Sequence, residues 1–192
     1  MTNKKNFTWK SPNILIKKTK NRGLGVFANK VINKNELILV MGGYIFDIED
    51  ENNLNKFNED KPIEISQDFS ISPITIKETE SMIQHSINHS CQPNCGWKGQ
   101  LFLVAMKKIN KGEEVVYDYA TIMHSNNDSE TYFKMVCECG SRKCRGVVTE
   151  DDWKLPELQK KYDGYFQWYL QDKIDCLKKG KKYKKPYTLP KN

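Results

Sequence analysis

The chain has 192 residues, of which 38% are hydrophobic and 29% charged, with 11 Gly, 7 Pro and 6 Cys. A chain of this length removes roughly 70% of its unfolded surface from water on folding, so its core does not depend on disulfides. The composition excludes disordered, collagen-like and disulfide-rich proteins, and it predicts one soluble domain.

The net charge of +7 is concentrated at the C-terminus. Residues 173–192 contain eight lysines and one aspartate, so the rest of the chain is neutral. A basic terminal segment predicts attachment to an anionic partner such as nucleic acid or a nucleosome. A solubilising tail without a partner is the alternative, because a block of like charges repels itself in either case.

No run of about 18 apolar residues occurs, and no hydrophobic stretch follows the polar N-terminus. We therefore expect neither a membrane-spanning helix nor a signal peptide, and we place the protein in an intracellular, reducing compartment. Cysteines there are more often thiols or metal ligands than disulfides, which makes their spacing informative.

Short apolar or alternating runs, bounded by Asn, Gly and Lys, predict strands along most of the chain. A Gly-X-Gly turn at residues 23–25 leads into one of them, and a weak alternation with two prolines at residues 61–77 predicts short edge strands. Residues 47–60 are acidic and Asn-rich, which favours a surface loop or insert. The expected class is mostly β, with strands in the ranges 13–18, 24–28, 36–46, 101–105 and 114–119.

Only the C-terminal part has a helical pattern. After Trp153, apolar and aromatic residues recur at three- and four-residue steps as far as Ile174. They mark one buried face of a long helix, for which Asp163-Gly164 is the candidate break. An aromatic stripe of this kind predicts a core or a lid over it.

Three cysteines lie within eight residues, at Cys137, Cys139 and Cys144. This density is typical of a closed zinc site that lacks one ligand. A site of four thiolates has no open coordination position, so it would be structural. The candidates for the fourth ligand are Cys91, Cys95, Cys176, His85, His89 and His124.

The string Ile-Asn-His-Ser-Cys-Gln-Pro-Asn-Cys at residues 87–95 is the most distinctive in the chain. It follows Arg-Gly-Leu-Gly at residues 22–25 and precedes Gly-Glu-Glu-Val-Val-Tyr-Asp-Tyr at residues 112–119 and the cysteine cluster. In this order the motifs resemble the SET-domain protein lysine methyltransferases with a post-SET zinc-binding segment. The resemblance covers roughly residues 13–148 and implies several small curved β-sheets, a post-SET zinc clip and a helical C-terminal extension.

The resemblance also implies a division of the chain into segments. A short arm would precede the SET domain, the zinc segment would follow it, and helices and the basic tail would end the chain. The expected bounds are 1–12 for the arm, 13–122 for the SET domain with an insert at about 47–80, 133–148 for the zinc segment, 149–177 for the helical extension and 178–192 for the tail.

A binding site for S-adenosylmethionine is implied at the first two motifs. Backbone groups of residues 22–24 would receive the methionine part, and Gly25 would permit a close approach that a Cβ would block. Asn88 would bind through its side-chain amide, and His89 largely through its main chain at the adenine. The implied cofactor-binding residues are Arg22, Gly23, Leu24, Gly25, Asn88 and His89, and the implied structural Zn²⁺ ligands are Cys91, Cys137, Cys139 and Cys144.

The resemblance makes Tyr119 the catalytic tyrosine and Tyr117 the neighbour whose hydroxyl limits the number of methyl groups, which favours mono- or dimethylation. A lysine amine must be neutral to accept a methyl group, and deprotonating it at pH 7 costs about 4.6 kcal/mol. Burial in an apolar channel beside a cationic sulfonium lowers that cost. Transfer then needs alignment more than acid–base chemistry.

The expected function is protein-lysine N-methylation on a histone or a similarly basic protein, by a monomer that does not engage a membrane. The location would be the nucleus and its chromatin in a eukaryote or for a host-directed effector, and otherwise the cytoplasm. One alternative is an inactive SET-like scaffold, because Met41 stands where many members have a channel tyrosine. Another is a zinc-stabilised nucleic-acid or chromatin binder that uses the Lys-rich tail.

Overall fold

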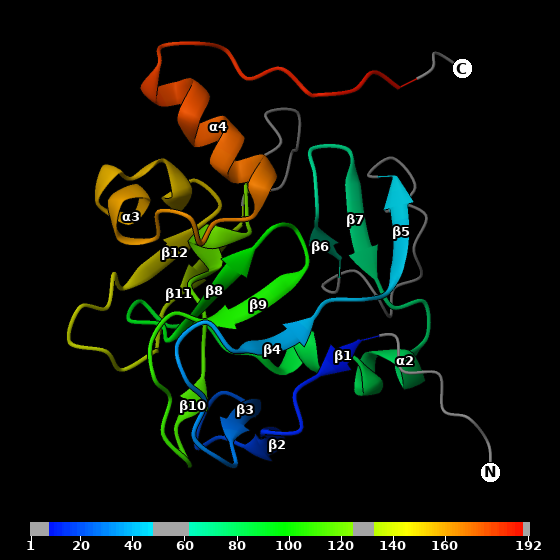
Figure 1. The fold of residues 1–192 in the computed structure, drawn as a ribbon, viewed down its shortest axis with the longest axis vertical. Coiled ribbons are helices and arrows are strands. Elements are labelled where there is room, and N and C mark those ends of the chain that lie inside the picture. Colours follow the sequence, from blue (N-terminus) through cyan, green and yellow to red (C-terminus); the bar gives the residue numbers. More distant parts are fainter. Residues whose placement is uncertain (1–7, 48–61, 125–132, 190–192) are drawn as a thin grey trace.

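The computed structural model describes residues 8–47, 62–124 and 133–189 (Figure 1). Most of the predicted acidic loop, at residues 48–60, lies outside this part of the chain. Within it, short antiparallel strands form several small sheets, and the longest helix lies near the C-terminus. The mostly β class predicted from the sequence is confirmed.

The largest sheet contains four antiparallel strands in the order β1-β4-β9-β8. Its central strands contribute the buried side chains of Ile38, Leu39 and Leu103 to the main core, and Trp97 packs there from β8. The bounds are β1 (Trp9–Lys10), β4 (Leu37–Val40), β8 (Cys95–Lys98) and β9 (Phe102–Ala105).

A second sheet has the order β10-β3-β2 and carries the predicted Gly-X-Gly turn. Gly23 has φ +66°, a left-handed conformation that glycine adopts without strain, and its carbonyl accepts a hydrogen bond from the Thr19 N–H at 2.8 Å. The turn joins two of the predicted strands into a hairpin. The bounds are β2 (Ile14–Lys18), β3 (Leu24–Ala28) and β10 (Glu114–Val115).

The third sheet has the order β5-β7-β6. It shows that the single run predicted at residues 36–46 forms two strands. That run divides at Gly43, whose φ of +151° redirects the chain, so that β4 and β5 belong to different sheets. Of the two strands in the range 61–77, which was predicted to form edge strands, β6 lies at an edge of this sheet and β7 is central. A capping box between Thr75 and Glu78 starts α2, which was not predicted. The bounds are β5 (Tyr44–Asp47), β6 (Ile63–Glu64), β7 (Phe69–Ser72) and α2 (Ile76–Ser81), followed by a 3₁₀ helix at Ile83–Ser86.

The predicted strand at residues 114–119 is shorter than expected. It ends after β10, because the Asp118 side chain accepts a hydrogen bond from the Ala120 N–H and caps a 3₁₀ helix at Tyr119–Thr121. After residues 125–132, which the structure does not describe, β11 (Lys134–Val136) pairs with β12 (Val147–Thr149). The cysteine cluster lies between these two strands along the chain.

The C-terminal helices are α3 (Pro156–Lys161) and α4 (Trp168–Lys178), after a 3₁₀ helix at Asp152–Lys154. The predicted break is confirmed, since Gly164 lies between them with φ +71°. The aromatic stripe is core, as expected. A second hydrophobic cluster contains Ala120, Trp153, Leu158, Tyr162, Phe166, Tyr169, Leu170 and Ile174.

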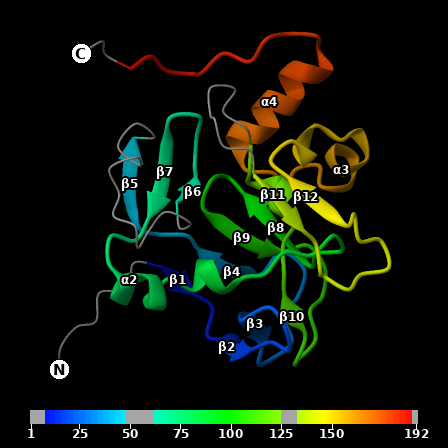
Figure 2. The ribbon, with the colours of Figure 1, turned by 180° about the vertical axis from the view of Figure 1, so that it is seen from behind.

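Beyond α4, the basic segment crosses to the β6–β7 hairpin (Figures 1 and 2). Lys185 forms an ion pair with Asp68, and the Tyr187 hydroxyl lies 3.0 Å from the Ser66 hydroxyl. Part of the tail is therefore bound to the protein's own surface. Among the helices described, none has the length and apolar character needed to cross a membrane.

Candidate functional site

The Arg-Gly-Leu-Gly motif at residues 22–25 and the Asn-His string at residues 87–95 are both implied in cofactor binding. They meet on one face of the protein, although about 65 residues separate them in sequence. The Asn88 amide donates to the Leu24 carbonyl at 2.9 Å and to the Glu114 carboxylate at 2.8 Å. Arg22 forms an ion pair with Glu114 at 2.5 Å and donates to the His89 carbonyl at 3.2 Å. These bonds join β3, β10 and the Asn-His string into one surface, which we call the implied cofactor face.

Gly25 lies at the most crowded point of this face. A Cβ there would stand 2.6 Å from the Thr19 Cγ2, 2.7 Å from a Glu114 carboxylate oxygen and 3.2 Å from the Asn88 amide nitrogen. The contacts come from the groups that join the two motifs. Packing within the protein therefore favours glycine at this position, and the approach of a cofactor to Gly25 stays a prediction.

We expect Gly25→Ala to destabilise the fold by about 1–3 kcal/mol, because a methyl group has no room in this packed position. Denaturant unfolding measures the change. A second variant, Thr19→Ser, removes the closest clashing methyl group and keeps the hydroxyl that accepts from the Arg22 N–H. Combining the two should restore part of the stability, and equal stability of Gly25→Ala and the native chain would contradict the steric argument.

His89 connects this face to the tyrosine motif. Its Nδ1 accepts a hydrogen bond from the Tyr119 N–H at 3.2 Å, and the main chain beside it pairs with Tyr117. Burial lowers the pKa of His89 to about 4, despite the nearby Asp118 carboxylate, so the ring is neutral at pH 7. Because Nδ1 accepts, the neutral ring carries its proton on Nε2, which faces the Cys91 Sγ at 3.2 Å. Binding of a metal at Nε2 would require the proton on Nδ1 instead, with loss of the hydrogen bond from Tyr119.

Tyr117 and Tyr119 line one cavity of about 320 Å³ with residues of β6 and of the segment around β12. Their ring centroids are 5.2 Å apart, and Trp97 packs edge-on against Tyr117 at 5.4 Å. Burial raises the pKa of both phenols, so both are neutral. The Tyr119 hydroxyl donates to the Ile87 carbonyl at 3.4 Å, and the Tyr117 hydroxyl has no hydrogen bond within the described part of the chain.

Asp118, between the tyrosines, is fully buried in a network that the sequence reading missed. Arg145 donates to both of its carboxylate oxygens, at 2.6 and 2.8 Å, and the Tyr162 hydroxyl donates to one of them at 2.8 Å. Burial opposes ionisation of Asp118, but these donors outweigh it and hold its pKa below the usual value. Arg145 directly follows Cys144, so the network ties the cysteine segment to the tyrosine motif.

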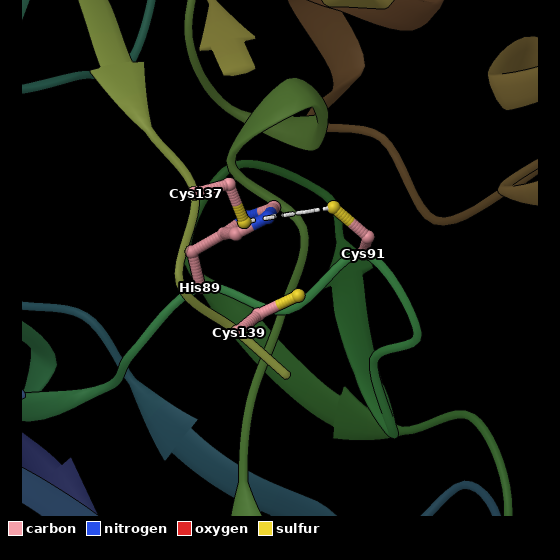
Figure 3. A group of neighbouring side chains, drawn as sticks. All are labelled: His89, Cys91, Cys137 and Cys139. Atoms are coloured by element: carbon pink, nitrogen blue, oxygen red, sulfur yellow. Dashed lines mark hydrogen bonds between the residues drawn. The ribbon is translucent and has the colours of Figure 1, made fainter. Parts of the chain in front are cut away.

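The structure brings three of the predicted zinc ligands together with one histidine (Figure 3). The ligand atoms of His89, Cys91, Cys137 and Cys139 all lie within 4.8 Å of one another. The His89 Nε2 is 3.2 Å from the Cys91 Sγ, which is 3.8 Å from the Cys137 Sγ. Three sulfurs and an imidazole nitrogen form a donor set that suits a tetrahedral metal ion.

Cys144, the remaining predicted ligand, lies beside this group but outside it. Its Sγ is 3.3 Å from the Cys137 carbonyl and its side chain is exposed.

Hydrogen bonds involving Ser141 and the backbone outweigh burial and lower the pKa of the Cys139 thiol to about 6, which favours the thiolate that binds metals. Whether Cys144 or His89 completes the ligand set stays open at this point.

The other candidates from the sequence fall elsewhere. Cys95 is buried and Cys176 half-buried, and neither candidate for the fourth ligand lies among the clustered ligand atoms. Met41 is buried in the main core and does not line the cavity. His85 and His124, two of the candidates for the fourth zinc ligand, line this cavity instead and lie outside the group of clustered ligand atoms.

Comparison with known proteins gives a consistent result. A family profile described as "SET domain" matches residues 23–120. The chain is 28% identical over 134 residues to human histone-lysine N-methyltransferase 2B, covering 64% of this chain and 5% of that protein. It is 33% identical over 152 residues to the histone-lysine N-methyltransferase ASHR3 of Arabidopsis thaliana, covering 72% of this chain and 28% of that protein.

A Schizosaccharomyces pombe protein, "Histone-lysine N-methyltransferase, H3 lysine-4 specific", is 32% identical over 134 residues, which cover 65% of this chain and 14% of that protein. The chain thus spans only a minor part of these relatives. The methyltransferase domain of human SETMAR has a similar fold, with a TM-score of 0.51 and 21% identity over 69% of this chain and 56% of that one. Because the family profile covers about half of its residues, the chain belongs to the SET-domain family.

Proposed function

We propose that the chain is an S-adenosylmethionine-dependent protein-lysine N-methyltransferase that acts on a histone or a similarly basic protein. The observation that carries the proposal is the set of hydrogen bonds that links the tyrosine cavity with the implied cofactor face. Tyr119 lines the cavity through its side chain and donates its N–H to His89, whose carbonyl is bound by Arg22 on the implied cofactor face. A methyl donor on one side and a lysine on the other would meet at this tyrosine.

The implied cofactor face fits S-adenosylmethionine, the methyl donor that membership of the family implies. When bound, this molecule supplies a methyl group attached to a positively charged sulfur. Its charged amino-acid part needs polar groups and its adenine needs apolar contact. The face offers Arg22 and Asn88 beside the side chain of Leu24, which is 49% exposed. We propose that residues 22–25, Asn88 and His89 hold it.

The cavity residues would orient and desolvate the target lysine. Apolar groups such as Ile87, Ile122 and Phe133 line it and disfavour the charged ammonium form. The neutral hydroxyl of Tyr119 offers oxygen lone pairs without a full charge, which suits alignment of an uncharged amine. The presence of Tyr119, Asn88 and His89 in the chain supports an enzyme over an inactive scaffold.

We further propose that the cysteine cluster binds a structural Zn²⁺. Its thiolate ligands would be Cys91, Cys137 and Cys139, with Cys144 or His89 as the fourth ligand. Four protein ligands leave no coordination position for a substrate. The ion would hold the β11–β12 segment against the Asn-His string, so that Phe133 stays in the cavity wall.

The product would be mono- or dimethyl-lysine, because the Tyr117 hydroxyl occupies space in the cavity. We expect Tyr117→Phe to raise the highest methylation state by one methyl group, since the ring stays packed against Trp97 while the hydroxyl is removed. Mass spectrometry of one methylated peptide, compared between native and variant enzyme, measures this. An identical product distribution would exclude a size-limiting role for that hydroxyl.

The site of action would be the nucleus, on chromatin. The curated relatives described above are named as histone-lysine methyltransferases. The lysines at 178, 179, 181, 182 and 184 are exposed and could contact nucleosomal DNA. Electrostatic contact of this kind weakens steeply as salt increases.

The test of the proposal is transfer of labelled methyl groups from S-adenosylmethionine to core histones, nucleosomes and lysine peptides by the full chain. Labelling of one substrate establishes the activity, and mass spectrometry of the product identifies the lysine. Absence of transfer by protein that binds the cofactor and contains its metal would instead favour the scaffold alternative.

A further inference from the structure

Tyr119 is held in the cavity mainly through its main chain. The hydrogen bond of its hydroxyl within the described part of the chain is long, at 3.4 Å to the Ile87 carbonyl. The main chain is fixed more firmly, because the Tyr119 N–H donates to His89 and the residue begins the 3₁₀ helix that Asp118 caps. The position of the phenol in the cavity therefore depends on Asp118.

Asp118 is oriented in turn by Arg145, 27 residues further along the chain. The Arg145 Nη1 donates to Oδ2 at 2.6 Å and its Nη2 to Oδ1 at 2.8 Å, and the carboxylate is fully buried. A guanidinium that binds both oxygens fixes the plane of a carboxylate as well as its distance. The Oδ1 atom is also the acceptor of the Ala120 N–H. Arg145 therefore sets the direction of the oxygen that caps the helix.

Arg145 has a second carboxylate partner, which does not touch the tyrosine motif. Its Nε donates to the Asp152 Oδ2 at 2.9 Å, and the Asp152 Oδ1 accepts from the Thr149 hydroxyl at 2.9 Å. Asp152 lies in the 3₁₀ helix after β12 and does not line the cavity. One ion pair of Arg145 thus points toward Tyr119 and the other away from it, so each can be removed separately.

The pair between Arg145 and Asp118 is poorly explained by stability alone. Removing both groups from water offsets most of their attraction, so a buried ion pair is weak evidence for a stabilising role. Its planar, two-bond geometry is instead suited to fixing an orientation. Orientation matters here because a misplacement of about 1 Å lowers a reaction rate about 100-fold.

We propose that the Arg145–Asp118 pair positions Tyr119 for methyl transfer, so that an arginine of the cysteine segment sets the rate of a reaction that it does not touch. The inference rests on the proposed methyltransferase function. Arg145 does not line the cavity, and it acts through the Asp118 carboxylate and the main chain of Tyr119. It is therefore a positioning residue.

Two variants of the full chain test the pair. Arg145→Lys keeps a positive charge beside the buried carboxylate and removes the planar fork. Asp118→Asn keeps a side-chain oxygen that caps the helix and removes the ionic bond to Arg145. In both we expect the single-turnover rate constant for labelled methyl transfer, per molecule of bound cofactor, to fall at least about tenfold. The affinity for S-adenosylmethionine should change less than about threefold and the metal content should not change.

Asp152→Asn is the matched control, because it removes the other ion pair of the same arginine. Denaturant unfolding should show a loss of stability in this variant, while its rate constant stays within about twofold of the native value. A merely structural role of Arg145 predicts instead that the rate constant falls in all three variants in proportion to the loss of stability.

Fluorine NMR of protein labelled with fluorotyrosine tests the position of Tyr119 without activity. The Tyr119 resonance, identified by its absence from Tyr119→Phe, should move or broaden in Arg145→Lys and Asp118→Asn and stay in place in Asp152→Asn. Near-native rate constants in the first two variants, or an equal loss in Asp152→Asn, overturn the inference and leave the proposed function intact. If the native chain transfers no methyl groups to peptides or histones, the proposed function fails, and an unmoved Tyr119 resonance in Arg145→Lys then overturns the positioning role separately.

Discussion

Tyr119→Phe is expected to lower kcat for methyl transfer by about 100- to 1,000-fold, the range seen when one preorganised polar group is removed from a transition state. The hydroxyl lines the cavity, and its single hydrogen bond to the Ile87 carbonyl is long, at 3.4 Å. It is therefore available to the reacting groups and contributes little to folding. Because burial raises the pKa of the phenol, the reactive form is the neutral hydroxyl.

Single-turnover transfer of labelled methyl groups measures this effect, and cofactor affinity and metal content are determined on the same samples. Tyr165→Phe is the matched control, because it removes a hydroxyl from a ring that packs against Lys98 and lies outside the cavity. Its kcat should stay within about twofold of the native value. If Tyr119→Phe keeps near-native kcat, the catalytic assignment of this tyrosine is wrong.

Cys91→Ala is expected to abolish metal binding and to destabilise the β11–β12 segment, whereas Cys95→Ala should do neither. Both side chains are about 1% exposed and lie four residues apart. Each substitution therefore removes one buried thiol. Only Cys91 lies among the clustered ligand atoms. Structural zinc contributes roughly 10–16 kcal/mol of binding free energy in small zinc domains, so loss of a thiolate ligand should strongly favour unfolding of this segment.

Metal analysis of the purified variants and thermal unfolding with and without a chelator measure both effects. Retention of a stoichiometric metal ion by Cys91→Ala would exclude the cluster as the binding site. Cys144→Ala decides the fourth ligand, because a set completed by Cys144 loses affinity in this variant and a set completed by His89 does not. The Co²⁺ absorption spectrum distinguishes four sulfur ligands from three with one nitrogen.

Local patterns in the sequence were sufficient for many of the elements and for the family, but not for α2 or for the division of residues 36–46 into β4 and β5. The alternation around β2, β3 and β9 predicted strands, and the aromatic steps after Trp153 predicted a helical core with a break at Gly164. The cysteine spacing and the Asn-His string indicated the site, because the residues within each of these motifs lie close together in sequence.

The pairing of distant residues required the tertiary structure. Arg145 meets Asp118, and His124 meets Glu64, only when separate elements pack, and neither pair has a spacing that a sequence pattern reports. The strand end before Tyr119 and the place of His89 among the sulfurs also depend on such contacts. By itself the sequence determined many of the strands, the helical C-terminal part and the family, since periodicity and motifs are local, whereas the folded chain decided where strands end and which charges and ligands meet.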